Sequence, residues 1–164
     1  MNRKGFTLIE LIAVIVILGI ILVVSAPSIS NVYKESKLKS EEIFVERLSQ
    51  SIDSYIKLNS DEIAFTSDGA ANKEEEGSTY QVNIWKAAIT VQNVIDDKLI
   101  SEEDYVNPGN KETKCTVNAE IEVYKDSDYV YCHKIKKESL GCLTDEYKNS
   151  ITGEYVIDTC VWSR

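Results

Sequence analysis

The first apolar stretch of the chain is long and almost unbroken. Residues 6–26 read FTLIELIAVIVILGIILVVSA. Such a run is long enough to cross a bilayer as a helix. One carboxylate, Glu10, interrupts it. An ionisable group inside a membrane-spanning segment costs roughly 2.5–3.5 kcal/mol on insertion scales, so we treat Glu10 as a candidate functional residue.

After this run, apolar residues recur at spacings of three and four, which indicates one face of an amphipathic helix. They are Ile29, Val32, Phe44, Leu48, Ile52, Tyr55 and Ile56. We therefore expect a single helix from residue 6 to about 58, about 80 Å long at 1.5 Å per residue. Residues 6–26 would lie in lipid and residues 27–58 would pack on a head domain. Pro27 removes a backbone donor, and it is expected to kink or loosen the helix.

Residues 59–164 are predicted to form the globular head. Residues 66–79 are polar and contain glycine, so they are expected to be an exposed loop. Residues 90–97 resemble a short helix with Thr90 as its N-cap. Ile84 and Trp85, just before it, fit either a strand or the start of the helix. Residues 107–110, with the sequence NPGN, predict a turn.

The C-terminal part of the chain predicts strands. Residues 116–124 alternate between apolar and polar side chains, which is typical of a half-buried antiparallel strand. A turn at 125–128 would return the chain along 129–135, with Tyr124 opposite Tyr129. Residues 139–153 are loop-like, and 154–162 supply a third strand. The predicted fold is α+β, with a long N-terminal helix against a small antiparallel sheet of about three strands.

All four cysteines follow the apolar run, and an even count in an extracellular domain indicates two disulfides. In the hairpin with its loop at 125–128, Cys115 and Cys132 are about 20 Å out of register at 3.3 Å per residue. A disulfide needs Cα atoms within about 7 Å. This excludes Cys115–Cys132 and, with it, the pairing of the other two cysteines, Cys142–Cys160. Of the two remaining patterns we favour Cys115–Cys142 with Cys132–Cys160. The first bond would close the open end of the hairpin, and the second would tie the last strand to its neighbour.

The N-terminal residues K-G-F-T-L-I-E (4–10) resemble the prepilin signature of type IV pilins and pseudopilins. The resemblance extends to Gly19 and Pro27, at positions where pilins often carry a glycine and a helix-loosening proline. It implies cleavage of leader residues 1–5 after Gly5 by a prepilin peptidase, and N-methylation of the new terminus at Phe6. It also implies a charge pair between Glu10 and the N-terminal ammonium of Phe6 on a neighbouring subunit.

Two other interpretations of the N-terminus fit less well. A secretory signal would need a small-residue cleavage site after a shorter apolar region; Val24-Ser25-Ala26 is followed by Pro27, which spoils it. A plain single-pass anchor would leave Glu10 unexplained. Arg3 and Lys4 precede the span, so the positive-inside rule predicts a plasma-membrane protein with its C-terminus outside.

The chain is acidic, with a formal net charge of −9. Removal of Arg3 and Lys4 with the leader would leave 16 Lys and Arg against 27 Asp and Glu, a net of −11. Such a surface disfavours direct nucleic-acid binding, which depends on clustered basic residues. Residues 133–137, HKIKK, form a basic cluster, which is expected to be a solvated strand end.

Candidate catalytic chemistry is sparse. Cys132 and His133 are adjacent, but neighbours on a strand point to opposite faces, so they are badly placed as a thiol–imidazole pair. The same problem weakens a zinc site made of cysteines and His133, and no C-x₂-C spacing supports it. The nine tyrosines could form a carbohydrate- or partner-binding surface, although packing at an interface or on the sheet is the simpler interpretation. We therefore expect no enzyme activity and no cofactor.

The resemblance implies a structural subunit of a type IV pilus, which waits in the membrane and then joins an extracellular filament of identical or related pilins. Its partners would be prepilin peptidase and the pilus assembly machinery. A minor pilin or pseudopilin of a type II secretion or DNA-uptake system would share every N-terminal feature. An anchored metal-binding or sensor domain is a third alternative.

Overall fold

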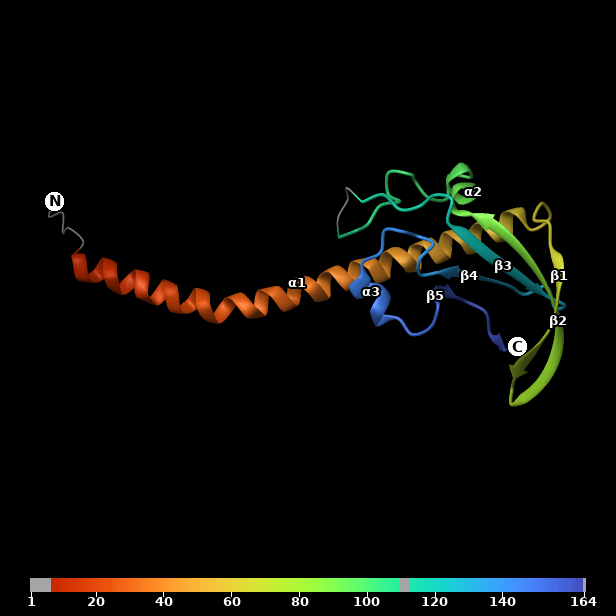
Figure 1. The fold of residues 1–164 in the computed structure, drawn as a ribbon, viewed down its shortest axis with the longest axis horizontal. Coiled ribbons are helices and arrows are strands. Elements are labelled where there is room, and N and C mark those ends of the chain that lie inside the picture. The colour runs from red at the N-terminus through yellow and green to blue at the C-terminus, as the bar shows by residue number, and fades with distance from the viewer. Residues whose placement is uncertain (1–6, 110–112, 164) are drawn as a thin grey trace. The chain divides into compact units, whose positions relative to one another are not determined.

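The computed structural model describes residues 7–109 and 113–163, with the side chains of 24–29 and 163 left out of the description. Its elements follow in chain order: α1 (Leu8–Asn59), β1 (Thr66–Glu75), β2 (Ser78–Thr90), α2 (Val91–Asp96), β3 (Glu120–Asp126), β4 (Tyr131–Lys136), α3 (Asp145–Ser150), β5 (Tyr155–Asp158) and β6 (Trp162–Ser163). A long N-terminal helix followed by an antiparallel sheet confirms the predicted α+β, pilin-like class (Figure 1).

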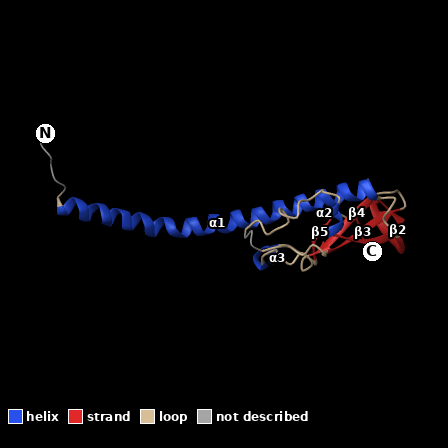
Figure 2. Cartoon of the chain, turned by 90° about the horizontal axis from the view of Figure 1, so that it is seen from above, coloured by secondary structure: helices blue, strands red, loops and turns tan. Residues whose placement is uncertain are grey.

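Two compact units divide the chain between Lys39 and Ser40, inside α1. The assigned helix continues through Pro27, so the proline does not end it. In the second unit, α1 buries one stripe of apolar residues at helical spacing: Val45, Leu48, Ile52 and Ile56. Figures 1 and 2 show this part of α1 running along the sheet. Of the predicted stripe, Leu48, Ile52 and Ile56 are therefore buried, with Val45 as an additional member, and Phe44 and Tyr55 are half-buried. The prediction is wrong for Val32, which is 66% exposed, and the side chain of Ile29 lies outside the description.

The sheet has six antiparallel strands, twice the predicted number, in the order β5-β4-β3-β2-β1-β6. The side chains that face α1 include His133 of β4, which reaches Ser49 and Asp53 on the helix. Val123 lies opposite His133 in the strand pairing, and Ile121 lies two residues from Val123 on the same face. Both of these apolar side chains are fully buried. The helix and this face of the sheet thus enclose the main core of the head.

The loop predicted for residues 66–79 is wrong, because these residues form the β1–β2 hairpin. Their polarity reflects exposure on both faces rather than irregular backbone, since Ala71 alone is buried in β1. Glu76 and Gly77 both have positive φ, 50° and 80°. Two successive residues with positive φ make the tight turn that suits a two-residue hairpin. The undecided pair Ile84 and Trp85 belongs to β2.

The predicted register of the second hairpin is also wrong. Tyr124 lies opposite Cys132, not Tyr129. The cause is Asp126, whose buried carboxylate accepts hydrogen bonds from the backbone N–H groups of Asp128 and Val130, both at 2.9 Å. This capping moves the turn toward the C-terminus, and Tyr129 adopts a positive φ of 61° within it.

Other predicted boundaries shift as well. The strand expected over 116–124 begins only at Glu120, because Ala119 donates to the carbonyl of Thr116 in a turn. A helix, α3, lies inside the expected loop 139–153. The third strand expected over 154–162 is two short strands, β5 and β6, on opposite edges of the sheet.

The short helix after Thr90 is confirmed as α2, with Thr90 at its N-cap. The turn at 107–110 has Pro108 and Gly109 in turn conformation, and its last residue lies outside the described residues.

The head sheet is curled. Its two edge strands, β5 and β6, are joined by only residues 159–161. The curl encloses a second apolar cluster on the face away from α1: Ala71, Val82, Ile84, Tyr124 and Cys132, with Cys160 and Trp162 packed against it. Trp162 meets the ring of Tyr124 edge-on, with ring centroids 6.5 Å apart. Lys73 of β1 pairs with the buried Asp126 at 3.0 Å on the same face.

Candidate functional site

The cleavage and methylation residues predicted from the sequence, Gly5 and Phe6, lie outside the described residues. The described chain begins at Thr7, and Thr7 and Glu10 form a reciprocal cap at the start of α1. The Glu10 carboxylate accepts from the Thr7 N–H at 2.9 Å and from its Oγ1 at 2.8 Å. The Glu10 N–H donates to Thr7 Oγ1 at 3.3 Å. Glu10 therefore has a local partner before any neighbour arrives.

This cap was not predicted, although its signal is present in the sequence. Thr7 followed three residues later by Glu10 is the capping-box pattern, in which each side chain satisfies a free backbone N–H of the first helical turn. Thr7 supplies hydrogen bonds but no positive charge. A role for Glu10 as the partner of an ammonium group thus stays a prediction beside the capping role.

The apolar side chains at the start of α1 are exposed in the single chain. They include Leu8 at 78%, Leu22 at 70% and Val23 at 76% exposed. Exposed apolar surface of this extent indicates a surface that another apolar medium or molecule covers. In the part of the chain that the structure describes, no helix combines the length and apolarity needed to cross a membrane. A Cβ atom added at Gly19 would meet nothing within 4 Å, so no contact within the described chain requires glycine at this position.

Two disulfides join the cysteines of the head: Cys115–Cys142 and Cys132–Cys160, with Cα–Cα distances of 4.7 and 5.1 Å. These are the pairs that the sequence favoured, although the strand register behind that choice was wrong. In the observed register the N–H of Thr116 donates to the carbonyl of Leu140 at 2.8 Å. That bond extends the β3–β4 pairing to the point where Cys115 meets Cys142.

The prediction of a solvated basic cluster is wrong for His133. Its side chain, on β4, is fully buried against α1. Its Nε2 lies 3.0 Å from Ser49 Oγ, and its Nδ1 lies 3.1 Å from Asp53 Oδ1. The lysines of the cluster have partners: Lys134 pairs with Asp158, Lys136 with Glu154, and Lys137 donates to two carbonyl oxygens. His133 therefore joins helix to sheet.

A catalytic thiol at Cys132 is ruled out by its disulfide with Cys160. Among residues 7–109 and 113–163, no group of three or more His, Cys, Asp or Glu side chains is placed to hold a metal ion. Aromatic residues do gather on the sheet: the Lys125 ammonium lies 5.1–5.8 Å from the ring centroids of Phe65, Trp85 and Tyr129. Tyr105, Tyr124 and Tyr147 are buried within the head, whereas Tyr129 is 73% exposed.

Burial of His133 predicts a pH dependence of head stability. Burial lowers the pKa of His133, although Asp53 partly opposes this effect. His133 therefore binds a proton more readily in the unfolded chain than in the folded head. The contribution of the neutral, buried side chain to the free energy of unfolding is complete above about pH 6.5, and it is lost as the pH falls through the lower folded pKa. We expect urea unfolding of the full chain in detergent to show stability declining from pH 7 toward pH 5. His133→Gln, which removes the only histidine, should flatten this decline, and an unchanged slope would contradict the assignment.

Glu41 is the buried carboxylate that ties α1 to two distant segments. It is 0% exposed. Its Oε1 accepts from Asn107 Nδ2 at 2.9 Å and from the Thr144 N–H at 3.1 Å, and its Oε2 accepts from Thr144 Oγ1 at 2.7 Å. Thr144 is also the N-cap of α3 and accepts from the Tyr147 N–H. Asn107 donates in addition to the carbonyl of Cys142. One side chain therefore anchors the loop before residue 110 and the start of α3.

Glu41→Ala is expected to destabilise the head by roughly 2–4 kcal/mol, because buried donors of Asn107 and Thr144 would lose their acceptor. Glu46→Ala is the matched control. Glu46 lies on the same helix but is exposed, with one long hydrogen bond from Gln50. Glu46→Ala should therefore lower the free energy of unfolding by no more than about 0.5 kcal/mol. Chemical unfolding of both full-length variants in detergent measures the difference. Equal losses would show that the buried network does not stabilise the head.

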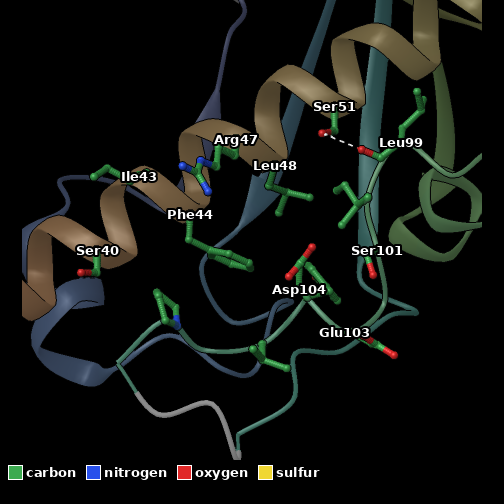
Figure 3. Close-up of a pocket in the computed structure, with 14 residues that line it drawn as sticks. Ser40, Ile43, Phe44, Arg47, Leu48, Ser51, Leu99, Ser101, Glu103 and Asp104 are labelled. Atoms are coloured by element: carbon green, nitrogen blue, oxygen red, sulfur yellow. Dashed lines mark hydrogen bonds between the residues drawn. The ribbon is translucent and has the colours of Figure 1, made fainter.

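A groove of about 600 Å³ opens between α1 and residues 99–108 of the head. Its α1 wall carries Ser40, Ile43, Phe44, Arg47, Leu48 and Ser51. Figure 3 shows Phe44 and Asp104 pointing into the space between the two walls, and the Ser51 hydroxyl bonded to the carbonyl of Leu99. The ring of Phe44 packs on that of Tyr105, with centroids 5.8 Å apart. Nothing in the sequence pattern indicated this groove, because its two walls come from segments that are far apart in the chain.

Comparison with known proteins bears on the N-terminus. Residues 1–26 match the family model described as the prokaryotic N-terminal methylation motif, which is the type IV pilin and prepilin signature. No curated protein and no solved structure matches the chain. The motif indicates a type IV pilin-like or pseudopilin protein, and the α+β arrangement of a long N-terminal helix and an antiparallel sheet is pilin-like. The motif implies processing by prepilin peptidase, a membrane-anchored precursor and assembly into pilus-type polymers, and the pilin type is structural rather than enzymatic.

Proposed function

We propose that the chain is a structural subunit of a type IV pilus. The methylation motif at residues 1–26 carries this proposal. In it, the precursor is a single-pass plasma-membrane protein with its head outside, is cleaved after Gly5, and is methylated on Phe6. Subunits then leave the lipid, and their apolar helices pack together in an extracellular filament that serves adhesion, motility or biofilm formation. Subunit contacts whose rotation does not close produce such open helical assemblies.

The exposed apolar side chains around the first part of α1 support the same proposal. Side chains such as Leu8, Leu22 and Val23 lack cover in the single chain. Lipid would cover them before assembly, and the helices of other subunits would cover them afterwards. A minor pilin or pseudopilin of a secretion or DNA-uptake system would use the same segment, but it would contribute few subunits to each fibre.

Mass spectrometry of protein from sheared surface fibres tests the proposal. We expect the mature chain to begin at Phe6 and to carry one N-terminal methyl group, and we expect it to dominate the fibre preparation. An intact leader of residues 1–5 on assembled protein would contradict the pilin assignment. A processed chain present only in trace amounts in the fibres would favour the minor pilin or pseudopilin role.

A further inference from the structure

The groove beside α1 is a preformed binding surface with an apolar floor. Ile43 is 40% exposed, and Phe44 and Leu99 are each half-buried along it. Figure 3 shows that α1 and the facing loop leave this space open between them. A concave surface lined by apolar side chains is typical of binding sites.

The loop wall of the groove is held in place independently of any occupant. Tyr105 is 2% exposed, and its carbonyl accepts from the Cys115 N–H. Asn107 is buried, and its side chain bonds to Glu41 and to the carbonyl of Cys142. A partner would therefore meet a rigid wall, and less ordering entropy would oppose its binding.

The rim of this wall is acidic. Glu102, Glu103 and Asp104 are consecutive and exposed, and the last two line the groove. The opposite wall contributes the guanidinium of Arg47. An occupant with an apolar or aromatic anchor and flanking positive charges would match this arrangement, since opposite charges across an interface fix its register.

The same chain offers such a segment earlier on α1. Tyr33 is 67% exposed, Lys34 is exposed and Lys37 is partly exposed. Lys37 is four residues from Tyr33 and three from Lys34, so the three side chains share one face of the helix. Tyrosine is also among the residues that most often anchor protein interfaces.

We propose that the groove binds residues 33–37 of α1 from a second copy of this chain. Tyr33 enters the apolar space near Phe44, and Lys34 and Lys37 face Glu103 and Asp104. This is a helix-in-groove contact between two different surfaces, so it propagates from copy to copy without closing. The inference rests on the proposed function, because only a filament brings many copies into such proximity.

Charge exchange in the full chain tests the contact. The double variant Lys34→Glu/Lys37→Glu should lower fibre incorporation at least about tenfold, because it places like charges together. Glu103→Lys/Asp104→Lys should do the same. Combining all four changes should restore incorporation to within about twofold of wild type. Glu74→Lys/Glu75→Lys, on exposed residues of the β1–β2 hairpin outside the groove, is the matched control and should have little effect.

A cysteine pair tests proximity directly. The native cysteines are all in disulfides, so Ser36→Cys with Ile100→Cys adds two free thiols and keeps the Tyr33 anchor. Ser36 is exposed and lies three residues from Tyr33 on the helix. Mild oxidation of intact fibres should produce a ladder of covalent multimers on non-reducing gels, and neither single variant should give more than dimers. Normal fibres from both charge-reversed variants, or failure of the fourfold variant to recover together with no ladder, would overturn the groove contact and leave the filament function standing. Absence of wild-type fibres would overturn both.

Discussion

Glu10→Ala is expected to be inserted in the membrane and cleaved after Gly5, yet to enter fibres at least about tenfold less than wild type. In the proposed filament, the carboxylate pairs with the ammonium of Phe6 on a neighbour. Removing it leaves that ammonium buried without a partner, which costs several kcal/mol. Insertion should be normal or better, because the mutation also removes an ionisable group from the apolar segment. Fibre content after shearing, compared with the membrane pool, measures the effect.

The cap at Thr7 makes a sharper control possible. Glu10 hydrogen-bonds to Thr7, so a defect in Glu10→Ala could come from a weakened helix start. Thr7→Val removes the hydroxyl half of the cap and keeps the carboxylate, and loss of a cap costs about 1 kcal/mol. We expect Thr7→Val to assemble nearly normally and Glu10→Gln to fail nearly as badly as Glu10→Ala. Equal defects in Thr7→Val and Glu10→Ala would assign Glu10 to capping, and wild-type incorporation of both Glu10 variants would rule out charge pairing.

The sequence predicted those parts of the fold whose signals are local. The long N-terminal helix, the stripe ending at Ile56 and the short helix after Thr90 follow from periodicity and capping, which act within a few residues. Strand β1 and the first residues of β2 escaped prediction because they are almost entirely exposed and so lack the alternation that marks a half-buried strand. The Glu76-Gly77 turn was their one local signal.

Register escaped prediction for a different reason. The β3–β4 turn is set by the side chain of Asp126, which is buried against Lys73 from the distant strand β1. Glu41, Asn107 and Thr144 form one hydrogen-bonded network, but they are far apart in the chain and each is an ordinary polar residue in its own segment. Long-range polar contacts of this kind depend on the completed fold, so neither the network nor the groove beside it could be derived from local patterns.

Removal of either disulfide is expected to destabilise the head by about 2–5 kcal/mol, enough to unfold a small domain near physiological temperature. The cysteines of the two bonds are 27 and 28 residues apart. Because loop closure depends on length, both bonds restrict the unfolded chain to nearly the same extent, roughly 3–4 kcal/mol in the entropic account. If removal of the two disulfides lowers the free energy of unfolding by different amounts, the difference therefore reports contacts in the folded head.

Loss of Cys132–Cys160 should be the more damaging of the two. Cys132 and Cys160 both pack in the second apolar cluster, beside Tyr124 and Trp162. Their bond also holds the short link between the edge strands β5 and β6. Its removal would therefore let the two edges of the curled sheet separate. Urea unfolding of Cys132→Ala/Cys160→Ala and Cys115→Ala/Cys142→Ala in detergent, with Trp162 accessibility to a quencher, makes the comparison. Two results would contradict this account of how the head is held together. One is a Cys115–Cys132 link in non-reducing peptide maps of wild type, and the other is a loss in either variant no larger than that of an ordinary surface substitution, about 0.5 kcal/mol.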